Sequence, residues 1–149
     1  MTGFPSKIIG LVIVFIMLVL GPTLRSVQMD SISQRRELYN EVTNMLDNIT
    51  DSGEITNQTI EDFYLGIASK GIPVDVKIER YVKIVNPDGN GGTYYTYTYS
   101  DNINDWNKGD ICKIKVTQLA ETNLQKLSYN LSKMYAKPID FTFAGRVRN

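Results

Sequence analysis

The sequence predicts an α+β protein in which a long N-terminal helix packs against a small antiparallel sheet of three to four strands, with one or two further helices. The first observation is an apolar stretch, Ile8 to Leu24, that contains no charged residue. The second is the chain from Arg25 to Gly53, which lacks Gly and Pro before its end and carries apolar residues at helical spacing. The third is the alternation of apolar and polar residues beyond Pro73, which predicts strands.

Composition and charge narrow the classes of function. The 149 residues leave one ordinary domain once the apolar stretch is set aside. Lys plus Arg and Asp plus Glu are 16 each, so no charge excess points to nucleic acid. The chain has no histidine, which removes the commonest general base and the usual zinc ligand. We therefore expect no enzymatic activity, no cofactor or metal, and no small-molecule substrate.

The apolar stretch is 17 residues long, enough for a helix of about 26 Å, which approaches the hydrocarbon thickness of a bilayer. Two other interpretations compete: a buried core helix, and the hydrophobic region of a signal peptide. No pair of small residues marks a cleavage site, and a core helix would have to be buried all round. We favour a retained membrane or filament-core helix formed by Ile8, Ile9, Leu11, Val12, Ile13, Val14, Phe15, Ile16, Leu18, Val19 and Leu20.

Four segments follow from these patterns: a short tail over 1–7, the apolar helix over 8–24, its continuation over 25–50, and an α+β head over 51–149. Gly21 and Pro22 predict a kink, because proline supplies no N–H and clashes with the preceding turn.

The polar stretch 28–37 predicts a stalk outside the membrane. A stripe then follows that should cover a sheet, formed by Leu38, Val42, Met45, Leu46 and Ile49. We expect a single-pass protein in a bacterial cytoplasmic membrane, with its head outside.

The head begins with a second helix, capped by Thr56 and ended by Gly71 before Pro73. Its expected buried face is Ile60, Phe63, Tyr64 and Ile67. Strands are predicted from Val74 to about Val85 and over 93–100, and the loop 86–92 joins them into an antiparallel hairpin.

A third strand is predicted over 110–117, with Cys112, Ile114 and Val116 on one face. Cys112 is the only cysteine, so no internal disulfide can form, and we expect a small buried residue there. A third helix is predicted from the spacing of Leu124, Leu127, Leu131 and Met134, and the alternation over 139–143 predicts a final strand.

Candidate sites are few. Asn86, Asp88, Asn90 and Gly91 match the start of an EF-hand loop, but Tyr97 stands where the bidentate Glu belongs, so we expect an ordinary hairpin loop. The remaining candidate is a contact surface formed by Tyr95, Tyr97 and Tyr99, which share one face of their strand. We favour packing of this face against the long helix or a cross-strand neighbour. The alternative is an exposed ladder that contacts another subunit or an extracellular ligand.

The order of elements resembles that of type IV pilin-like subunits, and more narrowly the TadE-like minor pseudopilins of tight-adherence (Tad) pilus systems in Gram-positive bacteria. The segments that carry the resemblance are MTGFPSKIIGLVIVFIMLVLGPTL, Ser52-Gly53-Glu54-Ile55-Thr56, Ile60-Glu61-Asp62-Phe63, Gly109-Asp110-Ile111, Pro138-Ile139-Asp140-Phe141 and Gly145-Arg146-Val147. The resemblance implies a non-enzymatic structural subunit whose partners are membrane lipid and other pilin-like subunits, of the same or another kind.

The resemblance also implies a processing junction between Gly3 and Phe4. The family usually carries a glutamate at the fifth residue of the processed product, whereas this chain has Ile8 there and Pro5 at the second position. Two other functions fit the sequence: a single-pass scaffold of a secretion or conjugation complex, and an anchored adhesin or ligand-binding module that uses the three tyrosines.

Overall fold

The computed structural model describes residues 3–132 and 137–149 and has the α+β architecture that the sequence predicts. Three helices and four strands follow in the order α1 (Phe4–Ser52), α2 (Asn57–Ser69), β1 (Val74–Pro87), β2 (Thr93–Ser100), β3 (Ile111–Gln118), α3 (Asn123–Ser132) and β4 (Asp140–Arg146). The strands form one antiparallel sheet in the order β2-β1-β3-β4. Met134, part of the predicted third-helix stripe, lies outside the described residues.

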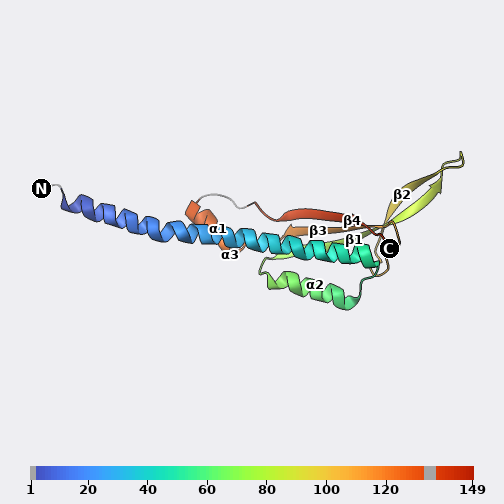
Figure 1. The fold of residues 1–149 in the computed structure, drawn as a ribbon, viewed down its shortest axis with the longest axis horizontal. Helices are drawn as coiled ribbons and strands as arrows, with labels where there is room; N and C mark the ends of the chain where they lie inside the picture. The colour runs from blue at the N-terminus through green and yellow to red at the C-terminus, as the bar shows by residue number, and fades with distance from the viewer. Residues whose placement is uncertain (1–2, 133–136) are drawn as a thin grey trace.

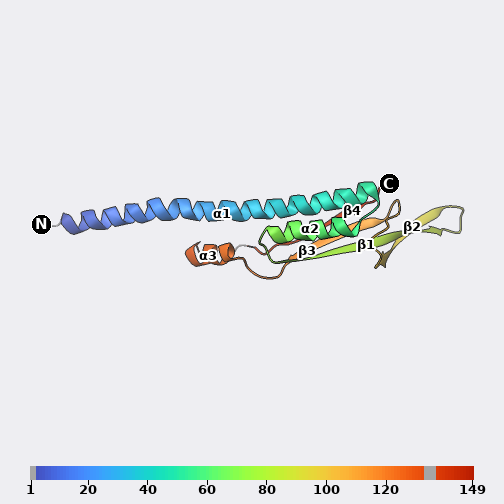
Figure 2. The same ribbon diagram turned by 90° about the horizontal axis from the view of Figure 1, so that it is seen from below.

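The head has two layers. Both views show α1 and α2 on one face of the sheet, with α3 beside α1 on the N-terminal side of the strands (Figures 1 and 2). The N-terminal part of α1 projects beyond the head with no other element beside it. The opposite face of the sheet is open, because Lys77, Lys115 and Thr142, from three neighbouring strands, are exposed there.

The predicted apolar stripe of α1 is confirmed as the centre of the core. Leu38, Val42 and Ile49 are fully buried and belong to one cluster with Ile114 and Val116 of β3. The strand β4 also approaches α1 closely: a Cβ atom on Gly145 would lie 2.8 Å from Cγ2 of Thr50. Glycine at this position therefore lets β4 lie directly against the side chains of Thr50 and Leu46 on α1.

Helix α1 ends at Ser52 and is capped by Gly53, whose φ of 71° is in the left-handed region and whose N–H donates to the Ile49 carbonyl at 3.0 Å. Helix α1 is continuous across Gly21 and Pro22, and its ribbon bends only gently along its length (Figures 1 and 2). The sequence predicts a kink at Gly21 and Pro22, but the structure has only a gentle bend there.

The second helix begins as predicted, since the Thr56 hydroxyl accepts a hydrogen bond from the Thr59 N–H at 3.2 Å. Its buried face is narrower than the sequence predicts. Phe63 and Ile67 are buried and Ile60 is partly buried, but Tyr64 is exposed and donates its hydroxyl to the Val76 carbonyl. The prediction that Tyr64 belongs to the core was wrong, because the ring lies at the edge of β1 rather than under the sheet.

The strand β1 pairs with two partners over different parts of its length. Its residues from Val74 to Tyr81 pair with β3, whereas those from Arg80 to Pro87 pair with β2. Beyond Tyr81 the hairpin is therefore a two-stranded ribbon, which extends past the end of α1 (Figure 1).

A buried ion pair lies where the ribbon leaves the sheet. Oδ2 of Asp110 accepts hydrogen bonds from Nε and Nη2 of Arg80 at 2.9 and 2.7 Å, and from the Asn107 N–H at 3.0 Å. Its Oδ1 accepts from the Lys83 N–H at 3.0 Å. The guanidinium also lies 5.6 Å from the Trp106 ring. Both charged groups are almost fully buried, so each charge is stabilised by the opposite charge of its partner.

We expect Asp110→Asn to lower the free energy of unfolding by about 3–5 kcal/mol, because the substitution leaves the buried Arg80 charge without a counter-charge. Urea unfolding of the full-length chain in detergent micelles measures this loss. Asp105→Asn, an exposed carboxylate in the same loop, is the matched control and should stay within about 0.5 kcal/mol of wild type. Equal effects of the two substitutions would contradict a structural role for the buried pair.

The same pair should make stability pH-dependent. Burial alone would raise the pKa of Asp110, but hydrogen bonds from two backbone N–H groups and the Arg80 charge outweigh burial, so its pKa is lowered. Its stabilising contribution is then complete above the unfolded-state pKa of about 3.9 and is lost as the pH falls through the folded-state value. We expect the stability difference between wild type and Asp110→Asn to be constant at neutral pH and to shrink below about pH 4. A difference that is unchanged down to pH 3 would contradict this assignment.

Candidate assembly surfaces

The apolar part of α1 is the largest exposed hydrophobic surface in the described chain. All eleven predicted residues of this segment are exposed, from 42% for Leu20 to 72% for Leu11. The window Ser6–Thr23 has a mean hydropathy of 2.2, and none of it is buried against the head. The core-helix interpretation is therefore wrong. This helix is long and apolar enough to cross a membrane, although a signal sequence near the N-terminus has the same properties.

A polar side chain near the end of this segment, that of Thr23, is suited to an apolar environment. The Thr23 hydroxyl donates to the Val19 carbonyl at 2.6 Å, so it brings no unsatisfied donor into the apolar surface.

The predicted processing junction is at the other end of the segment. Gly3 is exposed and directly precedes Phe4, the first residue of α1. Pro5 follows in the first helical turn, where its missing N–H removes no hydrogen bond. The predicted processing junction thus lies at the boundary between the tail and the helix.

The three predicted contact tyrosines share the face of the sheet that is turned away from α1. Tyr95 is 55% exposed, Tyr99 is 49% exposed, and Tyr97 is partly buried. The predicted packing against the long helix was wrong, because this part of β2 belongs to the ribbon and α1 lies on the other side of the sheet. A cross-strand contact is present for Tyr99, whose ring centroid lies 6.0 Å from that of Tyr81.

Each of these aromatic rings lies beside a cation. Nζ of Lys83 lies 3.7 Å from the centroid of the Tyr95 ring, and Nζ of Lys77 lies 6.0 Å from that of Tyr99. Nη2 of Arg146 on β4 donates to the Tyr97 hydroxyl at 3.3 Å. The exposed face is therefore an array of tyrosines and basic side chains contributed by several strands. Tyr and Arg are enriched at protein interfaces, so the tyrosines and Arg146 are residue types typical of a contact surface.

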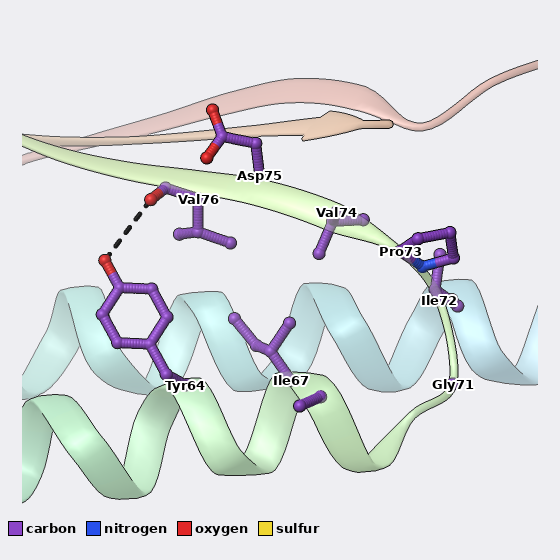
Figure 3. Close-up of a pocket in the computed structure, with 9 residues that line it drawn as sticks. Tyr64, Ile67, Gly71, Ile72, Pro73, Val74, Asp75 and Val76 are labelled. Carbon is purple, nitrogen blue, oxygen red and sulfur yellow. Dashed lines mark hydrogen bonds between the residues drawn. The ribbon is translucent and has the colours of Figure 1, made fainter. Parts of the chain in front are cut away.

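A hollow of about 670 Å³ lies between α2 and the start of β1 (Figure 3). Ile67, Val74 and Val76 line it, and the Tyr64 hydroxyl closes one side with its hydrogen bond to the Val76 carbonyl at 3.3 Å. Asp75 points to the other side of β1. Burial, and secondarily the charge of Asp75, raise the pKa of Tyr64. The residues that line the hollow bring together no nucleophile and base, so it has no catalytic arrangement.

The other candidate groups have structural roles. Burial raises the pKa of the Cys112 thiol to about 12, so this cysteine is an unreactive core residue, as predicted. Asp88 in the hairpin loop accepts hydrogen bonds from the N–H groups of Asn90 and Gly92, both at 2.8 Å. Within residues 3–132 and 137–149, no group of three or more Cys, Asp or Glu side chains is placed to hold a metal ion.

No protein-family model, curated protein or solved structure matches this chain.

Two features of these surfaces were missed from the sequence, although both left a signal there. Arg80 follows Val76 and Ile78 at a spacing of two, so the alternation places its charged side chain on the buried face. A buried charge needs a partner of opposite charge, so an acidic residue should lie beside it. Lys113 and Lys115 alternate with Cys112, Ile114 and Val116, which places both lysines on the face of the tyrosines.

We expect replacement of Tyr95, Tyr97 and Tyr99 by Thr to change the free energy of unfolding by less than about 1 kcal/mol per site. The reason is that Tyr95 and Tyr99 are exposed, Tyr97 is only partly buried, and Thr retains strand propensity. Phe63→Thr is the core control and should cost about 3–5 kcal/mol. Urea unfolding of the full chain in micelles distinguishes the two cases. A triple variant that unfolds before the Phe63 control would show that the tyrosines belong to the folding core.

Proposed function

We propose that this protein is a non-enzymatic, membrane-anchored subunit of a bacterial surface filament or of its membrane assembly complex, of the type IV pilin-like kind and most similar to TadE-like minor pseudopilins. Its α1 segment would hold the chain in the cytoplasmic membrane, or in a filament core after extraction. Its partners would be membrane lipid and other pilin-like subunits, and its head would make the lateral contacts.

The continuity of α1 carries this proposal. The helix that exposes eleven apolar residues is the same helix whose other half supplies Leu38, Val42 and Ile49 to the core of the head. The anchor and the head are thus joined by helix rather than by a linker, so movement of one moves the other. A cleaved signal peptide has no need of such a joint, and this favours retention of the segment.

The proposed orientation places the short tail inside the cell and the head outside. Cleavage after Gly3 would remove only the tail and leave all of α1. Because Ile8 stands where the family has a glutamate, registration of neighbouring helices in the apolar layer would have to come from the heads.

Two alternatives remain open. A scaffold of a secretion or conjugation complex would use the same anchor without ever leaving the membrane. An anchored adhesin or ligand-binding module is favoured by one observation, the exposure of Tyr95 and Tyr99 on an uncovered sheet face. Serine or threonine replacements of the tyrosines, with assembly and binding followed separately, distinguish the adhesin from the subunit.

The deciding experiment is to shear producing cells, collect the high-molecular-weight material and determine the intact mass of this chain there and in the membranes. We expect the chain in both fractions, with a mass that reports whether the first three residues are removed. Recovery of the full-length chain in membranes alone would reject the filament subunit in favour of the scaffold.

A matched pair of variants tests the anchor. Val14→Arg places a charge in the middle of the apolar segment, which costs about 2.5–3.5 kcal/mol of insertion free energy. We expect this variant to be lost from the membrane fraction in flotation. Asn40→Arg adds the same charge to an exposed position in the head-packed part of α1 and should float like wild type.

A further inference from the structure

The helical layer of the head is acidic. Between Glu37 and Ser69 the sequence contains seven carboxylates and no Lys or Arg. We define the acidic surface as five exposed members of this set: Asp47, Asp51, Glu54, Glu61 and Asp62. Glu37 is also exposed but is left out, because it pairs with Lys70 at 3.6 Å. In the part of the chain that the structure describes, Arg148 pairs with Asp51 at 3.2 Å and no basic side chain pairs with the other four. The acidic surface therefore carries uncompensated negative charge.

The face of the sheet opposite these helices is basic and aromatic. We define the basic face as Lys77, Lys83, Lys113, Lys115 and Arg146, interleaved with the exposed tyrosines of β2. The strand register places three carboxylates on the same face, those of Asp75, Glu79 and Asp140. Glu79 is shared between Lys77 at 3.1 Å and Lys113 at 3.5 Å.

One detail of this face points to an external counter-charge. Lys77 and Lys115 are directly opposite each other in the β1–β3 register, and both are exposed. Like charges at directly opposed positions destabilise a sheet. In the part of the chain that the structure describes, Glu79 pairs with Lys77, whereas Asp75 and Asp140 lie diagonal to Lys115 without forming an ion pair with it. Carboxylates from another molecule would give Lys115 a partner and relieve this repulsion.

Figures 1 and 2 place α1 and α2 on one side of the sheet. The acidic surface, which these helices and the turn between them carry, and the basic face therefore lie on opposite sides of one head. Two copies that join by these unlike surfaces can therefore keep their α1 helices parallel, with both apolar segments in the same bilayer or filament core. Each copy still offers one free surface of each kind. Such a heterologous contact repeats instead of closing as a two-fold dimer.

We propose that the basic face of one copy binds the acidic surface of a second copy, and that this contact propagates the assembly. This inference rests on the proposed function, since it names the head contact that a filament or assembly subunit would use. Apolar side chains accompany the charges on both sides: Val85 and Tyr95 beside the basic face, and Leu65 beside Glu61 and Asp62. The contact thus combines charge complementarity with exposed apolar area that burial would stabilise.

The test uses the full-length chain in phosphatidylcholine vesicles, with energy transfer between donor- and acceptor-labelled copies. A sheet variant carries Lys77→Glu with Lys115→Glu, and a helix variant carries Glu61→Lys with Asp62→Lys. We expect each variant alone to self-associate at least about tenfold more weakly than wild type, because like charges then face each other. An equal mixture of the two variants should recover the wild-type signal, because the acidic sheet of one meets the basic helices of the other.

The matched controls are Lys108→Glu and Glu121→Lys, which reverse exposed charges outside both surfaces and should leave energy transfer unchanged. Raising the salt from about 0.05 M to about 0.5 M should weaken wild-type association, because it shortens the screening length severalfold. Circular dichroism of each variant checks that the head stays folded, and the glutamine versions of the same variants replace any that does not.

Three outcomes would overturn the proposal: a wild-type chain without energy transfer, reversal variants that associate like wild type, or folded variants whose mixture does not recover. The shear experiment separates this failure from failure of the proposed function. A chain found in sheared filaments whose association ignores these reversals would remain a filament subunit and would use another contact.

Discussion

Burial of one stripe of α1 under the sheet is the interaction on which the rest of the structure depends. Five side chains between Leu38 and Ile49 enter the core, and each contributes about 1.5–3 kcal/mol by leaving water. Because the same helix continues into the apolar segment, this burial also fixes the direction in which that segment leaves the head. A change in the stripe would therefore alter both the stability of the head and the orientation of the anchor.

The Arg80–Asp110 pair holds the base of the β1–β2 ribbon, at the end of the molecule opposite the apolar segment. Through Asp110 it connects β1 to the loop that carries Asn107, at the point where the strand exchanges β3 for β2 as its partner. A two-stranded ribbon is only marginally stable alone, so its base needs a fixed attachment. The buried pair supplies that attachment, which allows the ribbon to project with its tyrosines uncovered.

The net charge of the chain is zero, but its acidic and basic residues are on different surfaces of the head. The helical layer and the open sheet face have opposite signs, and the fold places them on opposite sides of the head. In the proposed assembly this arrangement would favour contact between copies of a chain whose net charge is zero. In the proposed assembly the apolar segment would supply affinity for the membrane or filament core, and the charged surfaces would supply the register.

The sequence by itself determined the elements, because their signals are local. The stripe from Leu38 to Ile49, the Thr56 cap and the alternation in β1 and β3 each depend on residues within a few positions of one another. Exposure of the tyrosines was decided only by the tertiary structure. Alternation assigns Tyr95, Tyr97 and Tyr99 to one face, but that face is open because β1 changes partners after Tyr81 and α1 covers the other side. The prediction that Tyr64 is buried was wrong for a similar reason, since helical spacing cannot reveal that its ring lies at the edge of β1. The opposition of acidic and basic surfaces likewise arises from packing, because it joins segments that are distant in the chain.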